Sequence, residues 1–300
     1  MNNVATDLPN SFSFALASKV KDYFQLIKFT LSFTVVFSCV VCYLLAPNIQ
    51  FDLLSVLLLF IAGMLITGSA NAINQIVEKD TDALMKRTAS RPVTAGRMGV
   101  NEAWMFSVIT GLAGVILMGY YFNWLSAMLG LFSLILYAFI YTPLKKINSI
   151  SVLVGAFPGA LPCLIGWVAA TDGFSAGGWI LFGIQFLWQF PHFWAIAWVA
   201  HKDYEKAGFK LLPGREGPTK FTALQSVIYS MLMIPVGMLP FYFHISGEIS
   251  LWILLACNLT MVYLSIMLFI QMNVKAARKV MFGSYFYLLV VLLSLLFDKV

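Results

Sequence analysis

Polar side chains gather at the end of an apolar run, in the stretch from Asn71 to Arg97. On an α-helix, which advances about 100° per residue, Asn71, Asn74, Glu78 and Asp82 fall within an arc of roughly 80°. Amide and carboxylate oxygens on one face suit a hard cation such as Mg²⁺, which binds through one or two carboxylates together with waters and phosphate oxygens. We therefore predict metal ligands at Asn74, Glu78 and Asp82.

Basic side chains follow these acids, and guanidinium groups bind phosphate through two parallel hydrogen bonds. The basic residues are Lys86, Arg87, Arg91 and Arg97. Acids beside such cations predict a metal-diphosphate site. The alternative is a loop whose mixed charges are solvated, but two amides still lie within the apolar run, where burial without a partner is costly. We assign catalytic roles to Asn71, Asn74, Glu78, Asp82, Arg87 and Arg91.

The composition predicts an all-α polytopic membrane protein. Of 300 residues, 60% are hydrophobic and only 11% are charged, and the mean hydropathy is +0.85. A helix needs about 20 apolar residues to cross the hydrocarbon core, and alternating short runs typical of a transmembrane barrel are absent. Nine segments qualify: residues 29–46, 53–74, 102–121, 124–141, 151–170, 177–200, 221–243, 249–271 and 279–297.

These segments predict one transmembrane domain, residues 29–297, with nine helices around a central cavity that opens at the cytoplasmic side. Residues 1–28 are expected to be a cytoplasmic segment in which a short interfacial helix runs from Val20 to Lys28. No signal peptide is evident at the N-terminus. A bacterial cytoplasmic (inner) membrane is the expected location.

The distribution of basic residues orients the chain. With the N-terminus in the cytoplasm, eighteen of the nineteen Lys and Arg residues lie in inside segments and only Lys299 lies outside, as the positive-inside rule requires. Topology thus explains the net charge of +6, and no nucleic-acid partner is inferred from it. The four cysteines lie in predicted spans and are interpreted as packing residues.

A second group of polar residues lies in the sixth segment. Gln185, Gln189 and His192 follow an i, i+4, i+7 spacing and share a helix face. Polar side chains at membrane depth usually face a cavity. Three interpretations of His192 stay open: a hydrogen-bonded core histidine, a proton carrier, or an axial ligand of a haem iron.

Two lysines could either anchor helices at the membrane surface or contact a substrate. Lys28 precedes the first span, and Lys145 follows Pro143, which ends the fourth. In the fifth span, Pro158 and Pro162 predict a kinked wall beside a cavity, with plain helix packing as the alternative.

An apolar, aromatic interior beside a metal-diphosphate site suits a substrate with a charged head and a long hydrocarbon tail. A prenyl diphosphate has that form. Mg²⁺ and the arginines would neutralise the departing diphosphate. Aromatic faces would stabilise the allylic cation, with Tyr137, Tyr141, Trp188 and Trp194 as candidates.

Several motifs resemble one known family. The run N-x-x-N-x-x-x-E-x-D-x-D-x-x-M-x-R-T-x-x-R-P, from Asn71 to Pro92, is similar to the first acidic motif, N-D-x-x-D-x-x-x-D, of the UbiA-type intramembrane prenyltransferases. Its defining positions are occupied here by Asn74, Gln75, Glu78 and Asp82. The runs YTPLKK, GAFPGALPCLIGW and WQFPHFWAIAW are similar to the branch of that family whose acceptor is haem, so the resemblance covers most of residues 20–215.

The resemblance implies farnesyl diphosphate and haem B as substrates, haem O as product and Mg²⁺ as cofactor, so haem is a substrate rather than a prosthetic group. A haem A synthase or terminal oxidase is the implied assembly partner. A second D-x-x-x-D motif of related aromatic prenyltransferases is incomplete here, because Ala207 follows Asp203 at the fourth position. The substrate-binding residues we then expect are Lys28, Tyr141, Lys145, Gln189, His192, Trp194, Lys202 and Asp203.

Two alternatives stay open. A prenyltransferase for another acceptor, such as a quinone or chlorophyll precursor, is the nearer one, and the incomplete second motif argues against it. A transporter with a polar lumen would place charges near the middle of the bilayer, whereas this sequence places nearly all of them at one edge.

Overall fold

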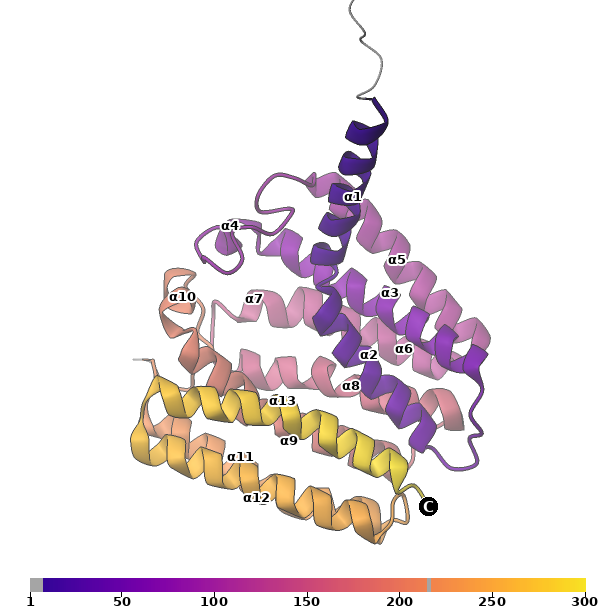
Figure 1. Cartoon of the computed structure of the whole chain (residues 1–300), viewed down its shortest axis with the longest axis vertical. Coiled ribbons are helices and arrows are strands. Elements are labelled where there is room, and N and C mark those ends of the chain that lie inside the picture. Colours follow the sequence, from indigo (N-terminus) through magenta and orange to yellow (C-terminus); the bar gives the residue numbers. More distant parts are fainter. Residues whose placement is uncertain (1–7, 215–216) are drawn as a thin grey trace, which may run out of the picture.

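The computed structural model describes residues 8–214 and 217–300, with side chains described from residue 17 onward. In these residues every secondary-structure element of more than one residue is a helix, as the sequence predicted. Nine long ones form the body (Figure 1): α2 (Phe29–Leu45), α3 (Leu53–Val77), α5 (Val100–Tyr121), α6 (Trp124–Ile135), α8 (Ser151–Thr171), α9 (Ala176–Val199), α11 (Lys220–Tyr242), α12 (Glu248–Gln271) and α13 (Val274–Phe297).

The nine helices coincide with the nine predicted spans. Eight spans in the described residues are long and apolar enough to cross a membrane, when α6 is counted with its continuation to Leu144. A ninth is reached when α2 is taken together with Ala17–Leu26 of α1 (Leu8–Leu26), from which it is bent by 53°. The predicted interfacial helix is thus longer than Val20–Lys28, and residues 1–7 of the predicted N-terminal segment lie outside the described residues.

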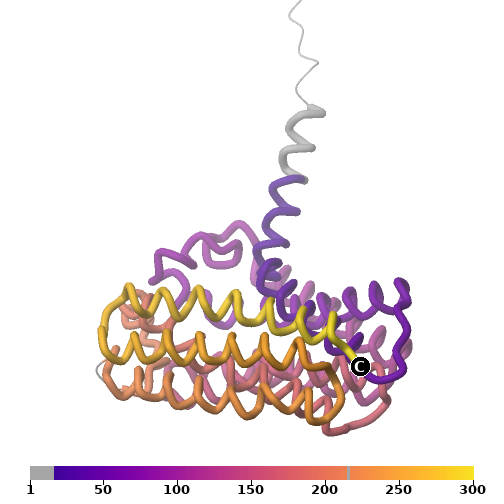
Figure 2. The backbone as a smooth tube through the Cα atoms, turned by 60° about the horizontal axis from the view of Figure 1, so that its bottom comes forward, coloured from indigo at the N-terminus to yellow at the C-terminus, as the bar shows by residue number. Residues whose placement is uncertain are grey.

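The long helices run side by side along one axis (Figure 1). Helices α2, α3, α5, α6 and α8 pack together in one half, and α9, α11, α12 and α13 pack in the other, with α8 against α9 and α2 against α13 joining the halves. In Figure 2 the C-terminal helices α11 to α13 form one flank of the molecule. Large apolar side chains stay exposed on the outer surfaces, as they must where the surrounding solvent is lipid.

Three short elements lie at one end of the bundle: α4 (Lys79–Asp82), α7 (Thr142–Leu144) and α10 (His201–Lys206). We call this end, with residues 78–99, 142–150 and 200–214, the basic end. It is the left end in Figure 1. Most of the predicted site residues lie on these elements or on the helix ends that lead into them, whereas Gln189, His192 and Trp194 lie further inside α9.

The basic end is tied to α1 by side chains. The guanidinium of Arg97 donates to Asp22 and to Gln25 Oε1, both at 2.9 Å. The Gln75 amide donates to the carbonyls of Gln25 and Leu26 at 2.8 and 2.9 Å at the C-terminal end of α1, where the Gln25 carbonyl also accepts from the Lys28 N–H at 3.1 Å. These contacts fix the α1 to α2 junction beside the end of α3.

Candidate functional site

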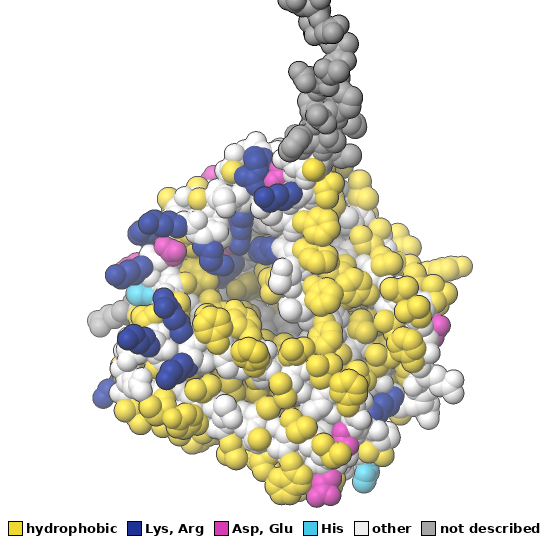
Figure 3. All heavy atoms as spheres, viewed as in Figure 1, with side chains coloured by type: hydrophobic (Ala, Val, Ile, Leu, Met, Phe, Trp, Pro, Cys, Tyr) yellow, Lys and Arg dark blue, Asp and Glu magenta, His cyan; other side chains and the backbone are white. Residues whose placement is uncertain are grey.

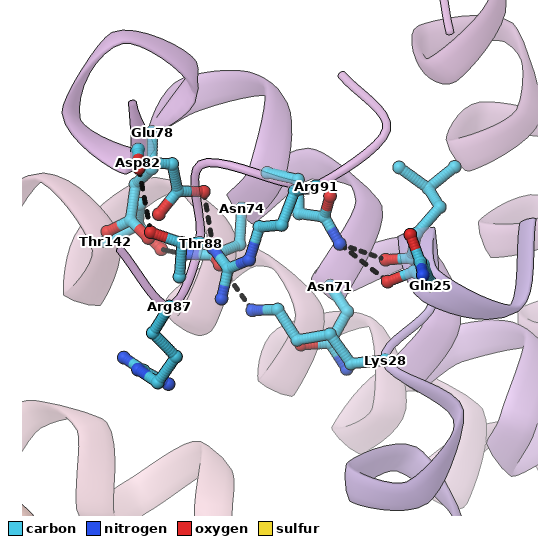
Figure 4. Close-up of polar contacts among 12 residues, drawn as sticks. Gln25, Lys28, Asn71, Asn74, Glu78, Asp82, Arg87, Thr88, Arg91 and Thr142 are labelled. Atoms are coloured by element: carbon cyan, nitrogen blue, oxygen red, sulfur yellow. Dashed lines mark hydrogen bonds and ion pairs between the residues drawn. The ribbon is translucent and has the colours of Figure 1, made fainter. Parts of the chain in front are cut away.

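The polar end of α3 is the starting point of the site. Asn71 and Asn74 lie in the last turns of α3 and are buried, with 3% and 1% of their surface exposed. The helix ends at Val77, Glu78 caps it, and a single turn of α4 carries Asp82. The single helical stripe expected from the sequence therefore breaks after Val77, but the turn returns Asp82 toward Glu78 and Asn74 (Figure 4).

Asn74 is held between two other elements. Its Oδ1 accepts a hydrogen bond of 2.6 Å from Lys28 Nζ, and its Nδ2 donates to Thr142 Oγ1 at 3.0 Å. Lys28 adopts left-handed backbone angles, φ 49° and ψ 57°, which are uncommon for a residue other than glycine. This strained junction directs the lysine into the site, as Figure 4 shows.

Asn71 extends the polar surface one turn deeper. Its Nδ2 donates to Ser32 Oγ at 3.0 Å, and its Oδ1 accepts from the Tyr137 hydroxyl at 3.4 Å. Tyr137 and Tyr141 lie in a π-helical segment, η1 (Leu136–Tyr141), where α6 approaches the basic end. Such segments recur at functional sites because they rotate side chains out of the regular helical register.

Glu78 forms a buried ion pair with Lys145, the first residue after α7. The lysine ammonium also lies 4.9 Å from the centre of the Tyr141 ring and 5.2 Å from that of Phe209. Glu78 and Lys145 are 5% and 7% exposed. The predicted substrate residues Lys145 and Tyr141 thus lie in direct contact beside an acid of the site.

Asp82 is fully buried and forms an ion pair with Arg91 through its Oδ2. Its other oxygen, Oδ1, has no hydrogen-bond partner among the described residues. Burial raises the pKa of Asp82, and the charge of Arg91 opposes this. A buried carboxylate oxygen without a partner fits a cation as its missing ligand.

Arg87 lies apart from the acids. It is exposed, donates to the Tyr204 hydroxyl at 3.3 Å, and lies 5.7 Å from the centre of that ring. In Figure 4 its guanidinium points away from Glu78 and Asp82. Arg87 therefore connects the loop after α3 to α10, and Arg97, which we expected among the phosphate-binding cations, is engaged with α1.

The polar residues of α9 diverge. His192 Nδ1 lies 2.7 Å from Ser284 Oγ of α13, and its ring stacks on Trp188 with centroids 4.7 Å apart. Gln189 turns the other way and donates to the Ala156 carbonyl of α8 at 2.9 Å. The stripe therefore splits between two neighbouring helices.

Trp194 and the two α10 residues lie away from the acids. Trp194 packs edge-on against Tyr229 at 5.3 Å, in a cluster with α8 and α11, and its indole nitrogen has no partner among the described residues. Lys202 is exposed and Asp203 is half-buried on α10. In the described part of the chain neither forms an ion pair with the cluster around Glu78.

Figure 3 shows a hollow in the side of the molecule that faces the viewer. Lys and Arg side chains line the edge toward the basic end, and hydrophobic side chains surround the rest. A separate pocket of about 710 Å³ lies between residues 147–149 and 208–214 and is lined by none of the predicted site residues. The hollow, rather than this pocket, combines the charged and apolar surfaces that the sequence predicted.

Sequence reasoning missed several residues that hold the site together. Thr142 Oγ1 accepts a hydrogen bond from the Asn74 amide, the Tyr204 hydroxyl accepts one from Arg87, and the Ser284 hydroxyl is hydrogen-bonded to His192. Thr142 lies within the YTPLKK run, beside the tyrosine and lysine that were predicted, so its hydroxyl was a visible signal. Tyr204 and Ser284 had no such signal, because only the packing of α10 and α13 brings them into contact.

Comparison with known proteins shows similarity to one family of prenyltransferases. The model of the UbiA prenyltransferase family matches residues 35–291. A protoheme IX farnesyltransferase of Cytophaga hutchinsonii is 46% identical over 285 residues, which are 95% of this chain and 100% of that protein. One from Christiangramia forsetii is 42% identical over 94% of this chain and 95% of its own length.

Solved structures share the fold. A structure of a digeranylgeranylglyceryl phosphate synthase has a TM-score of 0.78 at 23% identity, covering 94% of this chain and 98% of its own. A UbiA homolog from Archaeoglobus fulgidus, bound to GPP and Mg²⁺, has a TM-score of 0.67 at 14% identity, covering 91% and 99%. At these identities the likeness concerns the arrangement of helices.

Proposed function

Because the chain belongs to the UbiA prenyltransferase family, we propose that it transfers a farnesyl group from farnesyl diphosphate to a vinyl group of haem B, giving haem O and diphosphate. The observation that carries this proposal is the pairing of two buried carboxylates and a buried amide with three basic side chains at the basic end, on the side where Lys and Arg side chains edge the hollow. The near full-length similarity to protoheme IX farnesyltransferases supports the choice of substrates.

The chain's own residues would grip the diphosphate head. Asn74, Glu78 and Asp82 would hold Mg²⁺, which when bound neutralises charge on the departing diphosphate. Arg91, Lys145 and Lys28 already lie within contact distance of those residues. They can donate to phosphate oxygens as the bond from the farnesyl C1 to oxygen breaks and the diphosphate leaves with its electron pair.

The apolar part of the hollow would receive the farnesyl chain. Tyr137 and Tyr141 have ring centres 5.4 Å apart and come from η1, next to the polar end of α3. Their faces can stabilise the allylic cation left at C1. The surrounding apolar side chains exclude water, which protects the cation until the acceptor attacks.

The acceptor step forms a carbon–carbon bond. The vinyl double bond of haem donates its electron pair to the farnesyl C1, leaving positive charge on the vinyl carbon next to the porphyrin ring. Water then adds at that carbon and loses a proton, which gives the hydroxyethylfarnesyl side chain of haem O. Haem is consumed as a substrate in this scheme.

His192 is the residue we propose for holding the haem. The Ser284 hydroxyl donates to the Met281 carbonyl at 2.6 Å, so its oxygen is free to accept from His192 Nδ1. That arrangement leaves Nε2 with a lone pair, the form of histidine that ligates iron or accepts a hydrogen bond. Tyr285 of α13 lies edge-on to the His192 ring, with the ring centres 5.1 Å apart.

The remaining assignments follow from the same scheme. Lys202 and Asp203 of α10 and Trp194 of α9 are the further substrate contacts we propose, whereas Gln189, expected from the sequence to contact substrate, donates to the Ala156 carbonyl and is assigned to packing. We propose that the basic end faces the cytoplasm of a bacterial inner membrane, with the N-terminus on the same side. Metabolically, the product would pass to a haem A synthase or a terminal oxidase.

The direct test uses membranes that contain the protein. Farnesyl diphosphate, haem B and Mg²⁺ are added, and the pigments are separated by chromatography and identified by mass. Haem O should form with the wild type, and it should disappear when farnesyl diphosphate is omitted or a chelator removes Mg²⁺. Absence of haem O under complete conditions, in a protein shown to be folded, contradicts the proposed function.

A further inference from the structure

Each of the three residues proposed to hold Mg²⁺ is already engaged by a basic side chain. Asn74 accepts from Lys28 at 2.6 Å, Glu78 pairs with Lys145, and Asp82 pairs with Arg91. The three bases come from three different places in the chain: the α1 to α2 junction, the end of α7 and the loop after α4. Basic side chains of the protein therefore already occupy the positions beside the proposed metal ligands.

The balance of charge in this cluster is positive. Two carboxylates and three basic side chains leave a net charge of +1. Two other basic residues of the basic end have partners outside the cluster: Arg97 pairs with Asp22, and Arg87 lies over the Tyr204 ring. A divalent cation that binds alone would be repelled by the positive charge of this cluster. It would also displace the basic side chains from their partners without supplying an anion to pair with them.

Burial makes that displacement unfavourable. Glu78 and Lys145 are 5% and 7% exposed, Asp82 is 0% exposed, and the Arg91 side chain is 18% exposed. An ion that loses its partner in such surroundings remains an uncompensated buried charge. A diphosphate with a charge of about −3 offers new partners to all three bases, and together with one divalent cation it brings the cluster to neutrality.

We propose that Mg²⁺ and the diphosphate head bind this protein only together: as the metal takes the oxygens of Asn74, Glu78 and Asp82, Lys28, Lys145 and Arg91 pass to the phosphate oxygens. This inference rests on the proposed function, because it takes the diphosphate site as given. Its consequence is that free Mg²⁺ binds weakly and that metal and diphosphate strengthen each other by the same factor.

The test measures binding rather than turnover. The purified full-length protein in lipid nanodiscs is titrated with Mn²⁺, a paramagnetic substitute for Mg²⁺, and bound metal is followed by electron paramagnetic resonance. The titration is repeated with inorganic pyrophosphate, with the Mn²⁺-pyrophosphate complex in solution subtracted from a protein-free series. Mn²⁺ should bind at least about tenfold more tightly with pyrophosphate than without it.

The variant Lys145→Gln separates this inference from a merely structural role of the lysine. It leaves Glu78 without its cation, so Mn²⁺ alone should bind more tightly than to the wild type, and the effect of pyrophosphate should shrink. Arg91→Gln should act in the same way at Asp82 and serves if Lys145→Gln does not fold. Lys146→Gln, at the exposed neighbouring lysine, is the matched control and should change neither titration.

Tight Mn²⁺ binding to the wild type that pyrophosphate does not alter overturns the inference, as does the absence of saturable Mn²⁺ binding in the presence of pyrophosphate. Equal or weaker Mn²⁺ binding by both folded variants overturns it too. None of these results contradicts the proposed function if haem O is still formed in membranes. Failure to form haem O removes the proposed function whatever the metal titration shows.

Discussion

The end of α3 and the middle of α9 carry the two concentrations of polar residues in the membrane region, and the structure treats them differently. At the end of α3, amides and carboxylates converge with basic groups from three other parts of the chain, and Asp82 Oδ1 stays without a partner among the described residues. On α9, the Gln189 amide donates to the Ala156 carbonyl and His192 pairs with Ser284, although the neutral groups Gln185 Oε1 and Trp194 Nε1 have no hydrogen-bond partner among the described residues.

This difference separates polar residues that stabilise the bundle from those that await a ligand. A buried amide with a backbone partner closes a helix–helix contact, because its burial would otherwise be costly. A carboxylate that keeps one oxygen without a partner has capacity left for binding a ligand. On this comparison we propose the end of α3 as the reactive centre and Gln189 as a packing residue, while His192 has one ring nitrogen still available.

The largest effect should come from Asp82→Asn. The substitution keeps the shape of the side chain but removes the charge that pairs with Arg91 and that would hold the cation. We expect the rate of haem O formation to fall by about 10²- to 10³-fold, as for loss of one electrostatic contact to a transition state. The measurement is product formation in membranes with saturating farnesyl diphosphate.

Asp80→Asn is the matched control for that prediction, since Asp80 is a carboxylate two residues away that is exposed. It should retain the wild-type rate. If both variants lose activity equally, the charge of the loop rather than the buried position matters, and the contrast between α3 and α9 loses its basis.

A smaller effect is expected for His192→Ala. Loss of the free Nε2 should weaken haem binding and lower product formation by about 10- to 100-fold, a range typical of losing one metal ligand or its supporting contact. The measurement is the absorption spectrum of added haem together with the affinity for farnesyl diphosphate, which should not change. Ser284→Ala should show a weaker version of the same defect, because Nδ1 then loses the acceptor that fixes the ring.

Full haem binding by His192→Ala would make His192 a packing residue like Gln189. Gln189→Leu is the useful comparison, since it removes a polar side chain from the same helix. It should lower the unfolding temperature and leave the absorption spectrum of bound haem unchanged.

Much of the fold and part of the site could be predicted from the sequence. Nine spans follow from apolar length alone, because lipid forces every backbone group into a helix. The grouping of Asn71, Asn74 and Glu78 follows from helical periodicity. The basic partners of these residues do not follow from it, since Lys28 reaches the site through a left-handed junction and Lys145 follows the short helix α7, and neither feature has a periodic signal.

The interpretation of α9 shows the limit most clearly. Spacing placed Gln185, Gln189 and His192 on one face, but a helix in a bundle touches two neighbours at once, and residues about 60° apart can contact different ones. Which neighbouring helix each side chain contacts depends on how α9 packs against α8 and α13. The sequence therefore identified the residues without indicating which were already satisfied.

The smallest effect tests the packing role of Gln189 from the partner helix. An added Cβ at Gly159 of α8 would lie 1.9 Å from Gln189 Oε1 and 2.9 Å from its Cδ, closer than atoms can approach. Gly159→Ala should displace the amide from its backbone partner and lower stability by about 1–3 kcal/mol, as overpacking does. Gly183→Ala on α9, where the nearest atom is 3.4 Å away, should be nearly neutral.

The measurement is thermal unfolding in detergent, alongside the rate of haem O formation at low temperature. A stable Gly159→Ala protein with impaired haem binding would reverse the assignment, because it would mean that Gln189 acts on the substrate rather than on α8.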